Sequence, residues 1–242
     1  MRLSSSKLIA ILLHCLVFCD TAANPIPEYS DNDSYNQTLA SRQAKVALRI
    51  MPLGASITQG AASVPLNGYR KGLRDQMRFL GHEVNMVGSA QDGNFNDNQH
   101  EGHPGAVIGE MQSSGYANSA VRFKPNVITI LVGSNDCARA SKAGDRTFHI
   151  GKTKEMENLL NFLYDNIAGV TIVLATLPPT GAVPEYPDVN DYVYLLNSGY
   201  RSLVGRFKAA GKRIQLAEMN NGFYNVQNDG NGLDILHPNN AG

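Results

Sequence analysis

Short apolar runs alternate with longer amphipathic stretches along most of the chain, starting at Val46. The short runs are rich in Val, Ile and Leu, and each is bounded by glycine, proline or polar residues, which is typical of buried strands. Five such runs cover residues 46–53, 83–88, 126–133, 171–177 and 213–219. The pattern therefore predicts five buried strands.

The stretches between these strands are long enough for helices. They cover residues 68–80, about 107–121, 147–167 and 190–210. In the third of them apolar residues recur at helical spacing, at Met156, Leu159, Leu160, Leu163 and Ile167. Strands that alternate with helices predict a parallel sheet covered on both faces. We therefore expect one α/β domain, a three-layer α/β/α sandwich that binds its ligand at the carboxyl ends of the strands.

The first residues of the chain follow a different pattern. Arg2 and Lys7 precede an apolar run, residues 8–19, which is too short to span a membrane and is followed by small residues. This arrangement is typical of a secretory signal peptide, and an uncleaved membrane anchor is the less favoured alternative. We expect residues 1–23 to be removed and the mature protein to be secreted and extracellular.

A polar stretch without apolar periodicity follows the signal peptide. Residues 24–45 predict a flexible N-terminal extension, with glycosylation sequons at Asn32 and Asn36 that are either used or present by chance. Residues 46–242 then form the folded domain.

The charge balance excludes some partners. The chain carries 21 basic and 21 acidic residues, so its formal net charge is zero. A nucleic-acid or anionic-membrane partner would call for a basic surface, and the composition indicates none. We expect a monomer that binds a neutral small molecule or polymer and has no membrane contact in its mature form.

Cysteine usage adds little, because Cys15 and Cys19 leave with the signal peptide and Cys137 alone remains. An intrachain disulfide is therefore impossible in the mature chain. We favour a buried, unreactive Cys137 over one that has lost a partner.

The first predicted strand ends in the turn Gly54-Ala55-Ser56. A serine there would direct its hydroxyl into the crevice at the strand ends. Attack on a carbonyl needs a neighbouring base, because a serine hydroxyl is hardly ionised near neutral pH. Taken alone, Ser56 is better explained as a small residue that eases the turn.

The third predicted strand ends in Gly133-Ser134-Asn135-Asp136. The Asn135 amide could direct its N–H groups into the same crevice and stabilise an oxyanion. The alternative is an Asn-Asp turn that caps the next segment, which is the simpler explanation of this motif by itself.

Near the C-terminus, Asp234 stands three residues before His237, and Pro238 follows. The proline disfavours a helical His237, so we expect a loop in which Asp234 folds back to the imidazole. An aspartate on one ring nitrogen would leave the other to accept a serine proton.

A fourth segment, HEGHPGAVIGEM, begins at residue 100 and holds His100 and His103. Two histidines three apart suggest a metal site, but Gly102 and Pro104 break any helix that would align them, and no third ligand is evident. We expect no metal. Gly105 is more useful, because it has no side chain to block its backbone N–H and it could open a helix.

In this order, GASIT after a strand, the glycine of HPGAVI, GSND after the third strand and DILH resemble the four blocks of the SGNH hydrolases, which include the GDSL esterases and lipases. The resemblance covers about residues 46–242 and implies a flavodoxin-like α/β/α fold. It implies that Ser56 is the nucleophile, His237 the base and Asp234 its orienting acid. It also implies an oxyanion hole formed by the backbone N–H groups of Ser56 and Gly105 and the side chain of Asn135, with no cofactor.

Within this superfamily, MPLGASITQG, NGYRKGLRDQM, HEGHPG and GLDILHPNNAG look most like secreted family 3 carbohydrate esterases, which include acetylxylan esterases. That resemblance implies deacetylation of a plant-type polysaccharide such as acetylated xylan. Tyr69 and Arg70 could shape the entrance to the cleft, although a structural role at the helix start is favoured.

Two features depart from the family pattern. Ala55 stands where the GDSL pattern has aspartate, a change that leaves the triad intact. The sequence stops at HPNNAG, where relatives continue into a C-terminal helix, so we expect a C-terminally incomplete domain. Two alternatives to a short-chain esterase stay open: a lipase or lysophospholipase of the same superfamily, and a non-catalytic carbohydrate-binding protein on a decayed hydrolase scaffold.

Overall fold

The computed structural model describes residues 45–181, 186, 188–222, 225, 228, 230–231 and 234–239. The predicted signal peptide and nearly all of the predicted N-terminal extension lie outside the described residues. No helix within the described ranges is both long and apolar enough to cross a bilayer.

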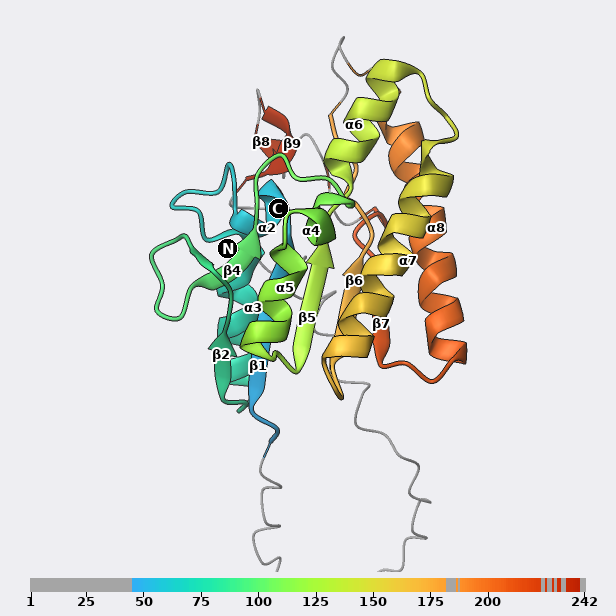
Figure 1. The fold of residues 1–242 in the computed structure, drawn as a ribbon. Helices are drawn as coiled ribbons and strands as arrows, with labels where there is room; N and C mark the ends of the chain where they lie inside the picture. Colours follow the sequence, from blue (N-terminus) through green and yellow to red (C-terminus); the bar gives the residue numbers. More distant parts are fainter. Residues whose placement is uncertain are drawn as a thin grey trace, which may run out of the picture.

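A seven-stranded sheet forms the centre of the domain (Figure 1). Across the sheet its strands are β3 (Ala90–Gln91), β4 (Gln99–Gly102), β1 (Leu48–Gly54), β5 (Val127–Leu131), β6 (Thr171–Ala175) and β7 (Ile214–Ala217), and β2 (Val84–Met86) pairs with the first half of β1. Neighbouring strands are parallel except for β3, which runs antiparallel to β4.

All five predicted strands form, as β1, β2, β5, β6 and β7. The sequence did not predict β3 and β4, because their residues are polar and lack the apolar run that marks the other strands. In β4 the residues His100, Glu101 and Gly102 are nevertheless buried. Their polar groups therefore need partners inside the protein.

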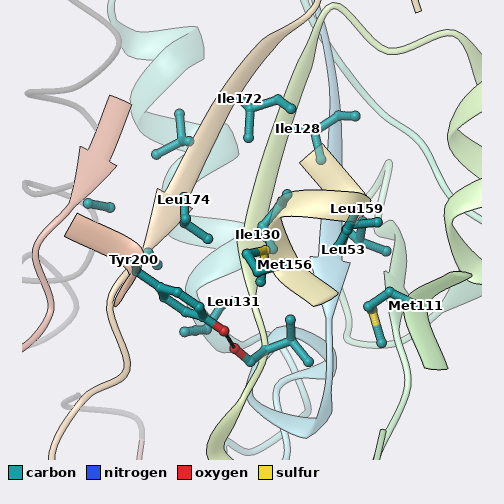
Figure 2. Close-up of a cluster of buried hydrophobic side chains, with 14 of the residues drawn as sticks. Leu53, Met111, Ile128, Ile130, Leu131, Met156, Leu159, Ile172, Leu174 and Tyr200 are labelled. Carbon is teal, nitrogen blue, oxygen red and sulfur yellow. Dashed lines mark hydrogen bonds between the residues drawn. The ribbon is translucent and has the colours of Figure 1, made fainter. Parts of the chain in front are cut away.

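Helices cover both faces of the sheet (Figure 1). On one face, Tyr69 of α3 (Gly68–Phe79) hydrogen-bonds through its hydroxyl to that of Thr129 in β5, at 3.1 Å. Side chains alternate along a strand, so Ile128 and Ile130 point to the other face. Figure 2 shows these two in a cluster with Met156 of α7 (Phe148–Asn166). The predicted three-layer α/β/α sandwich is confirmed.

Three of the four predicted helices form as α3, α7 and α8 (Val189–Ala209). The helix predicted near residues 107–121 is instead two helices, α4 (Glu110–Ser113) and α5 (Tyr116–Phe123). Gly115 lies between them at φ +79°, a left-handed conformation that ends a helix. The expectation that Gly105 opens a helix is wrong, because that helix begins at Glu110.

One helix, α6 (Ser134–Ala143), was not predicted. Its buried side chains are mostly small, so the apolar period is weak. Its end signals could have revealed it, since Asp136 lies in the first turn, Lys142 in the last, and Gly144 is left-handed at its C-terminus. Cys137 on this helix is fully buried, as predicted, and burial raises the pKa of its thiol.

The last described elements, β8 (Gly230–Asn231) and β9 (Asp234–Pro238), form an antiparallel pair apart from the large sheet. The loop predicted around His237 is therefore a strand. A residue before proline favours extended backbone, which suits a strand as well as a loop.

Candidate active site

The turn that carries Ser56 lies where three strands end side by side. β1 runs directly into the short helix α2 (Ser56–Gln59), and Gly54 at the end of β1 pairs with Gly102 of β4 on one side and Leu131 of β5 on the other. The segments after β4 and β5 carry Gly105 and Asn135. The sheet order thus brings three of the four sequence blocks to one edge.

The backbone around this turn is packed so closely that two positions need glycine, Gly54 at the end of β1 and Gly102 at the end of β4. A Cβ on Gly54 would overlap the carbonyl oxygen of Leu131, and a Cβ on Gly102 would overlap the backbone nitrogen of Gln59. α2 can therefore lie directly against β4. The hydroxyl of Thr58 in α2 also donates to the Leu131 carbonyl at 3.3 Å, and Thr58 is fully buried.

His237 of β9 contacts Ser56 directly. Its Nε2 lies 2.7 Å from the Ser56 hydroxyl oxygen, although the two residues are 181 positions apart in the sequence. This is the nucleophile-to-base distance that proton transfer requires. Both side chains are partly exposed, so a substrate could reach them.

Asp234 opens the same strand, three residues before His237. Its side chain lies outside the described part of the structure. The predicted contact between Asp234 and the imidazole therefore stays a prediction.

Asn135 lies in the first turn of α6. Side chains of α8 hold the start of this helix in place. Gly133 has a φ of +127°, and a Cβ there would crowd Leu196 and the hydroxyl of Tyr200. The Tyr200 hydroxyl donates to the Val132 carbonyl at 2.9 Å (Figure 2). The Asn-Asp turn that was the alternative explanation of this motif is thus the start of a helix, which α8 holds in place.

Asn135 and Asp136 both hold the segment that follows Gly105. The Asn135 amide donates to the Ala106 carbonyl at 2.9 Å, and the Asp136 carboxylate accepts the backbone N–H of Ile108 at 3.1 Å. Burial raises the pKa of Asp136 to about 6, although the Lys152 ammonium 3.3 Å away opposes the rise. Hydrogen bonds therefore connect the start of α6, which carries Asn135, to the segment that directly follows Gly105.

The two histidines of the fourth segment face different carboxylates. The His100 Nδ1 accepts the N–H of Gly102 at 2.9 Å, and its Nε2 lies 3.2 Å from Asp92. Burial, with the Arg70 charge, lowers the pKa of His100 to about 4, so its ring is neutral near pH 7. The His103 Nε2 lies 2.8 Å from Glu101. Within the described residues, no group of three or more His, Cys, Asp or Glu could hold a metal ion.

Tyr69 and Arg70 are buried and do not line an entrance. The Arg70 guanidinium donates to the Gln59 carbonyl at the end of α2, at 2.7 Å, and to three further backbone carbonyls, those of Leu66, Asp92 and Asn98. Arg70 thus supports the helix that carries Ser56. Glu101 and Asp136 are site-region residues that were not predicted from the sequence. Each lies within a sequence block that carries a predicted site residue, and this position was the available signal.

The protein-family model described as GDSL-like Lipase/Acylhydrolase matches residues 50–242. A search of curated protein sequences finds no match. Among solved structures, a family 3 carbohydrate esterase from Clostridium thermocellum has a TM-score of 0.63 and 24% identity, over 76% of this chain and 84% of its own. A family 3 carbohydrate esterase from Talaromyces cellulolyticus has a TM-score of 0.60 and 23% identity, over 79% and 88%. An acetyl xylan esterase has a TM-score of 0.56 and 18% identity, over 80% of this chain and 92% of its own.

At these identities the structural likeness shows a shared fold, while the family model spans most of the chain. The Ser56–His237 contact lies within the matched residues. The chain therefore belongs to the GDSL-like lipase/acylhydrolase family of carboxylic ester hydrolases.

Proposed function

We propose that this protein is a secreted serine esterase that removes acetyl or other short acyl groups from a carbohydrate, with an acetylated plant polysaccharide such as xylan as its substrate. The observation that carries the proposal is the 2.7 Å contact between the Ser56 hydroxyl and the His237 Nε2. Serine needs such a base in order to attack an ester carbonyl.

In the first half of the reaction, the Ser56 oxygen attacks the carbonyl carbon of the ester while His237 takes the serine proton. The tetrahedral intermediate then collapses, the bond to the sugar oxygen breaks, and His237 gives the proton to the leaving alcohol. Water repeats these steps on the acyl-enzyme and releases the acid. Asp234 holds the imidazole in the tautomer that accepts the serine proton. The reaction requires no cofactor.

Three donors stabilise the oxyanion: the backbone N–H groups of Ser56 and Gly105 and the side chain of Asn135. An amide carries two N–H groups, so the Asn135 bond to the Ala106 carbonyl leaves one for the substrate. One oxyanion donor is typically worth about 3 kcal/mol of barrier.

The carbohydrate substrate is supported by likeness alone. The structural neighbours include family 3 carbohydrate esterases and an acetyl xylan esterase, and the sequence blocks resemble the same branch. The sequence also lacks the Leu-rich or Phe-rich insertion that would build an apolar trough for long acyl chains. Short acyl groups are therefore favoured over lipid substrates.

The proposal that the protein is exported is supported by residues 1–23, which have a basic start followed by a short apolar run. We expect the protein recovered from the medium of expressing cells to begin at or near Asn24. N-terminal sequencing measures this directly, and an extracellular chain that still begins at Met1 would contradict cleavage.

Replacing Ser56 by alanine tests the reaction. We expect Ser56→Ala to lower kcat on an aryl acetate by about 10⁴-fold or more while the melting temperature stays close to that of wild type. His237→Asn should cost about as much, and the double variant little more, because the two residues act as one unit. Turnover by Ser56→Ala at the wild-type rate would refute the proposal.

The matched control is Ser202→Ala, which removes an exposed hydroxyl on α8 and should leave kcat unchanged. Running the wild type on acetyl and octanoyl esters and on acetylated xylan assigns the substrate. Faster octanoyl hydrolysis would favour a lipase. Saccharide binding without hydrolysis of any ester would favour a carbohydrate-binding protein.

A further inference from the structure

The backbone N–H of Gly105 is presented by a tight turn. The Ala106 N–H donates to the His103 carbonyl at 3.1 Å, and Pro104 and Gly105 occupy the two central positions, with Gly105 at φ +80°. These are the features of a type II turn, whose own hydrogen bond does not use the N–H of Gly105. A Cβ on Gly105 would meet nothing within 4 Å, so this part of the backbone faces open space. The direction of the N–H therefore depends on how the turn is anchored.

His103, the first residue of the turn, is anchored at three points. Its backbone N–H donates to the Gly54 carbonyl at 2.9 Å, two residues before Ser56. Its ring Nε2 lies 2.8 Å from a carboxylate oxygen of Glu101. The ring also stacks on Tyr116 of α5, with centroids 3.6 Å apart and planes 9° from parallel. His103 thus links the Gly105 turn to the end of β1, the strand that leads into Ser56.

Glu101 is the fixed end of this linkage. Its side chain is fully buried in β4 and also accepts the Ser89 backbone N–H at 2.6 Å and the Ser89 hydroxyl at 3.0 Å. Burial by itself raises the pKa of Glu101, but the hydrogen bonds from His103 and Ser89 outweigh it and hold the pKa below its usual value. An ionised carboxylate only accepts hydrogen bonds, so the His103 Nε2 carries the proton in this contact.

We propose that Glu101 and His103 are positioning residues, which keep the N–H of Gly105 in register with Ser56 so that it meets the oxyanion of the acyl-transfer step. This rests on the proposed function, in which Gly105 is an oxyanion donor. Neither side chain needs to touch the substrate. A misplacement of about 1 Å at a reacting centre can cost about 100-fold in rate, so small movements of the turn matter.

Two substitutions of His103 test the pair. His103→Leu removes the donor to Glu101, and we expect kcat on an aryl acetate to fall about 30- to 100-fold with KM within about twofold of wild type, because an oxyanion donor acts in the transition state. His103→Gln can place an N–H near the position of the imidazole Nε2 and should recover kcat to within about fivefold of wild type. A His103→Leu enzyme with the wild-type kcat would overturn the proposal, as would a His103→Gln enzyme no better than His103→Leu.

Further variants separate positioning from general damage. Ser89→Ala removes one hydrogen bond to the same carboxylate but leaves His103 in place, and it should keep kcat within about twofold of wild type. Tyr116→Leu removes the stacking but leaves Glu101 fully paired, so it tests the anchor even if His103→Leu does not fold. We expect it to lower kcat about fivefold, and Tyr116→Phe to match the wild type. Equal rates for Tyr116→Leu and Tyr116→Phe would count against the anchor.

A measurement without turnover separates the two proposals. In glycine-labelled protein, the amide of Gly105 should give one sharp NMR resonance in the wild type and a broadened or split one in His103→Leu. If that change appears while the wild type hydrolyses no ester, the anchoring of the turn is upheld and the proposed function fails. If the wild type is active and neither kcat nor the resonance changes in His103→Leu, the positioning pair fails and the proposed function stands.

Discussion

Ser56 and His237 meet at 2.7 Å, yet they come from regions that are built into the protein in different ways. Ser56 begins a helix enclosed between β4 and β5, with its last carbonyl held by the buried Arg70. His237 lies on β9, which, over the described residues, pairs with β8 and not with the seven-stranded sheet. The helix that carries Ser56 is thus packed against the large sheet, whereas His237 belongs to a separate strand pair.

This difference predicts how damage to each region should appear. Local opening requires less free energy where few buried groups hold a segment than where the segment is part of the core. We therefore expect changes around Ser56 to lower both the stability of the whole domain and its activity. Changes around β9 should lower activity alone.

Among the substitutions that compare these two regions, Gly102→Ala should have the largest effect. The added methyl group would overlap the backbone of α2, and relieving the overlap must move α2 or β4. We expect the free energy of unfolding to fall by about 1–3 kcal/mol, and kcat to fall about 100-fold because Ser56 moves with its helix. Denaturant unfolding and aryl acetate hydrolysis measure the two effects.

The control for this substitution is Gly151→Ala in α7, where an added Cβ meets nothing within 4 Å. Alanine is the better helix former, so this variant should be as stable as wild type or more stable, by up to about 1 kcal/mol. If Gly102→Ala behaved in the same way, the close packing of α2 against β4 would not be needed to hold Ser56.

A smaller effect is expected for Asn239→Ala, which tests the β8–β9 region. The Asn239 amide donates to the Gly230 carbonyl at 2.7 Å and to the Asn228 carbonyl at 3.1 Å, just beyond His237 in the sequence. Without these bonds we expect kcat to fall about tenfold, while the free energy of unfolding changes by less than about 1 kcal/mol. The assays are the same as for Gly102→Ala.

Asn166→Ala is the matched control, because it removes one side-chain bond to a backbone carbonyl, that of Phe162, at the end of α7. It should leave kcat unchanged. An Asn239→Ala enzyme with the wild-type kcat, or one that loses as much stability as Gly102→Ala, would break the contrast between the two regions.

Much of the fold could be read from the sequence, because five strands and three helices follow an apolar period that burial imposes on each element. The failures have physical causes. β3 and β4 are polar, and their buried groups find partners such as Ser89 and Asp92 that no local pattern reveals. α6 buries mostly small side chains, so its apolar period is weak, and the strand at His237 depends on pairing with β8.

By itself the sequence determined the alternation of strands and helices, the turn that presents Ser56, and the order of the blocks that contain Gly105, Asn135 and His237. Each strand, helix, turn and block is a local feature, since it depends on residues within a few positions of one another, and the order of the blocks is read directly along the chain. Only the tertiary structure decided that His237 reaches Ser56 and that Glu101 contacts His103. Such contacts depend on which strands become neighbours, and that is settled by the burial of the whole chain.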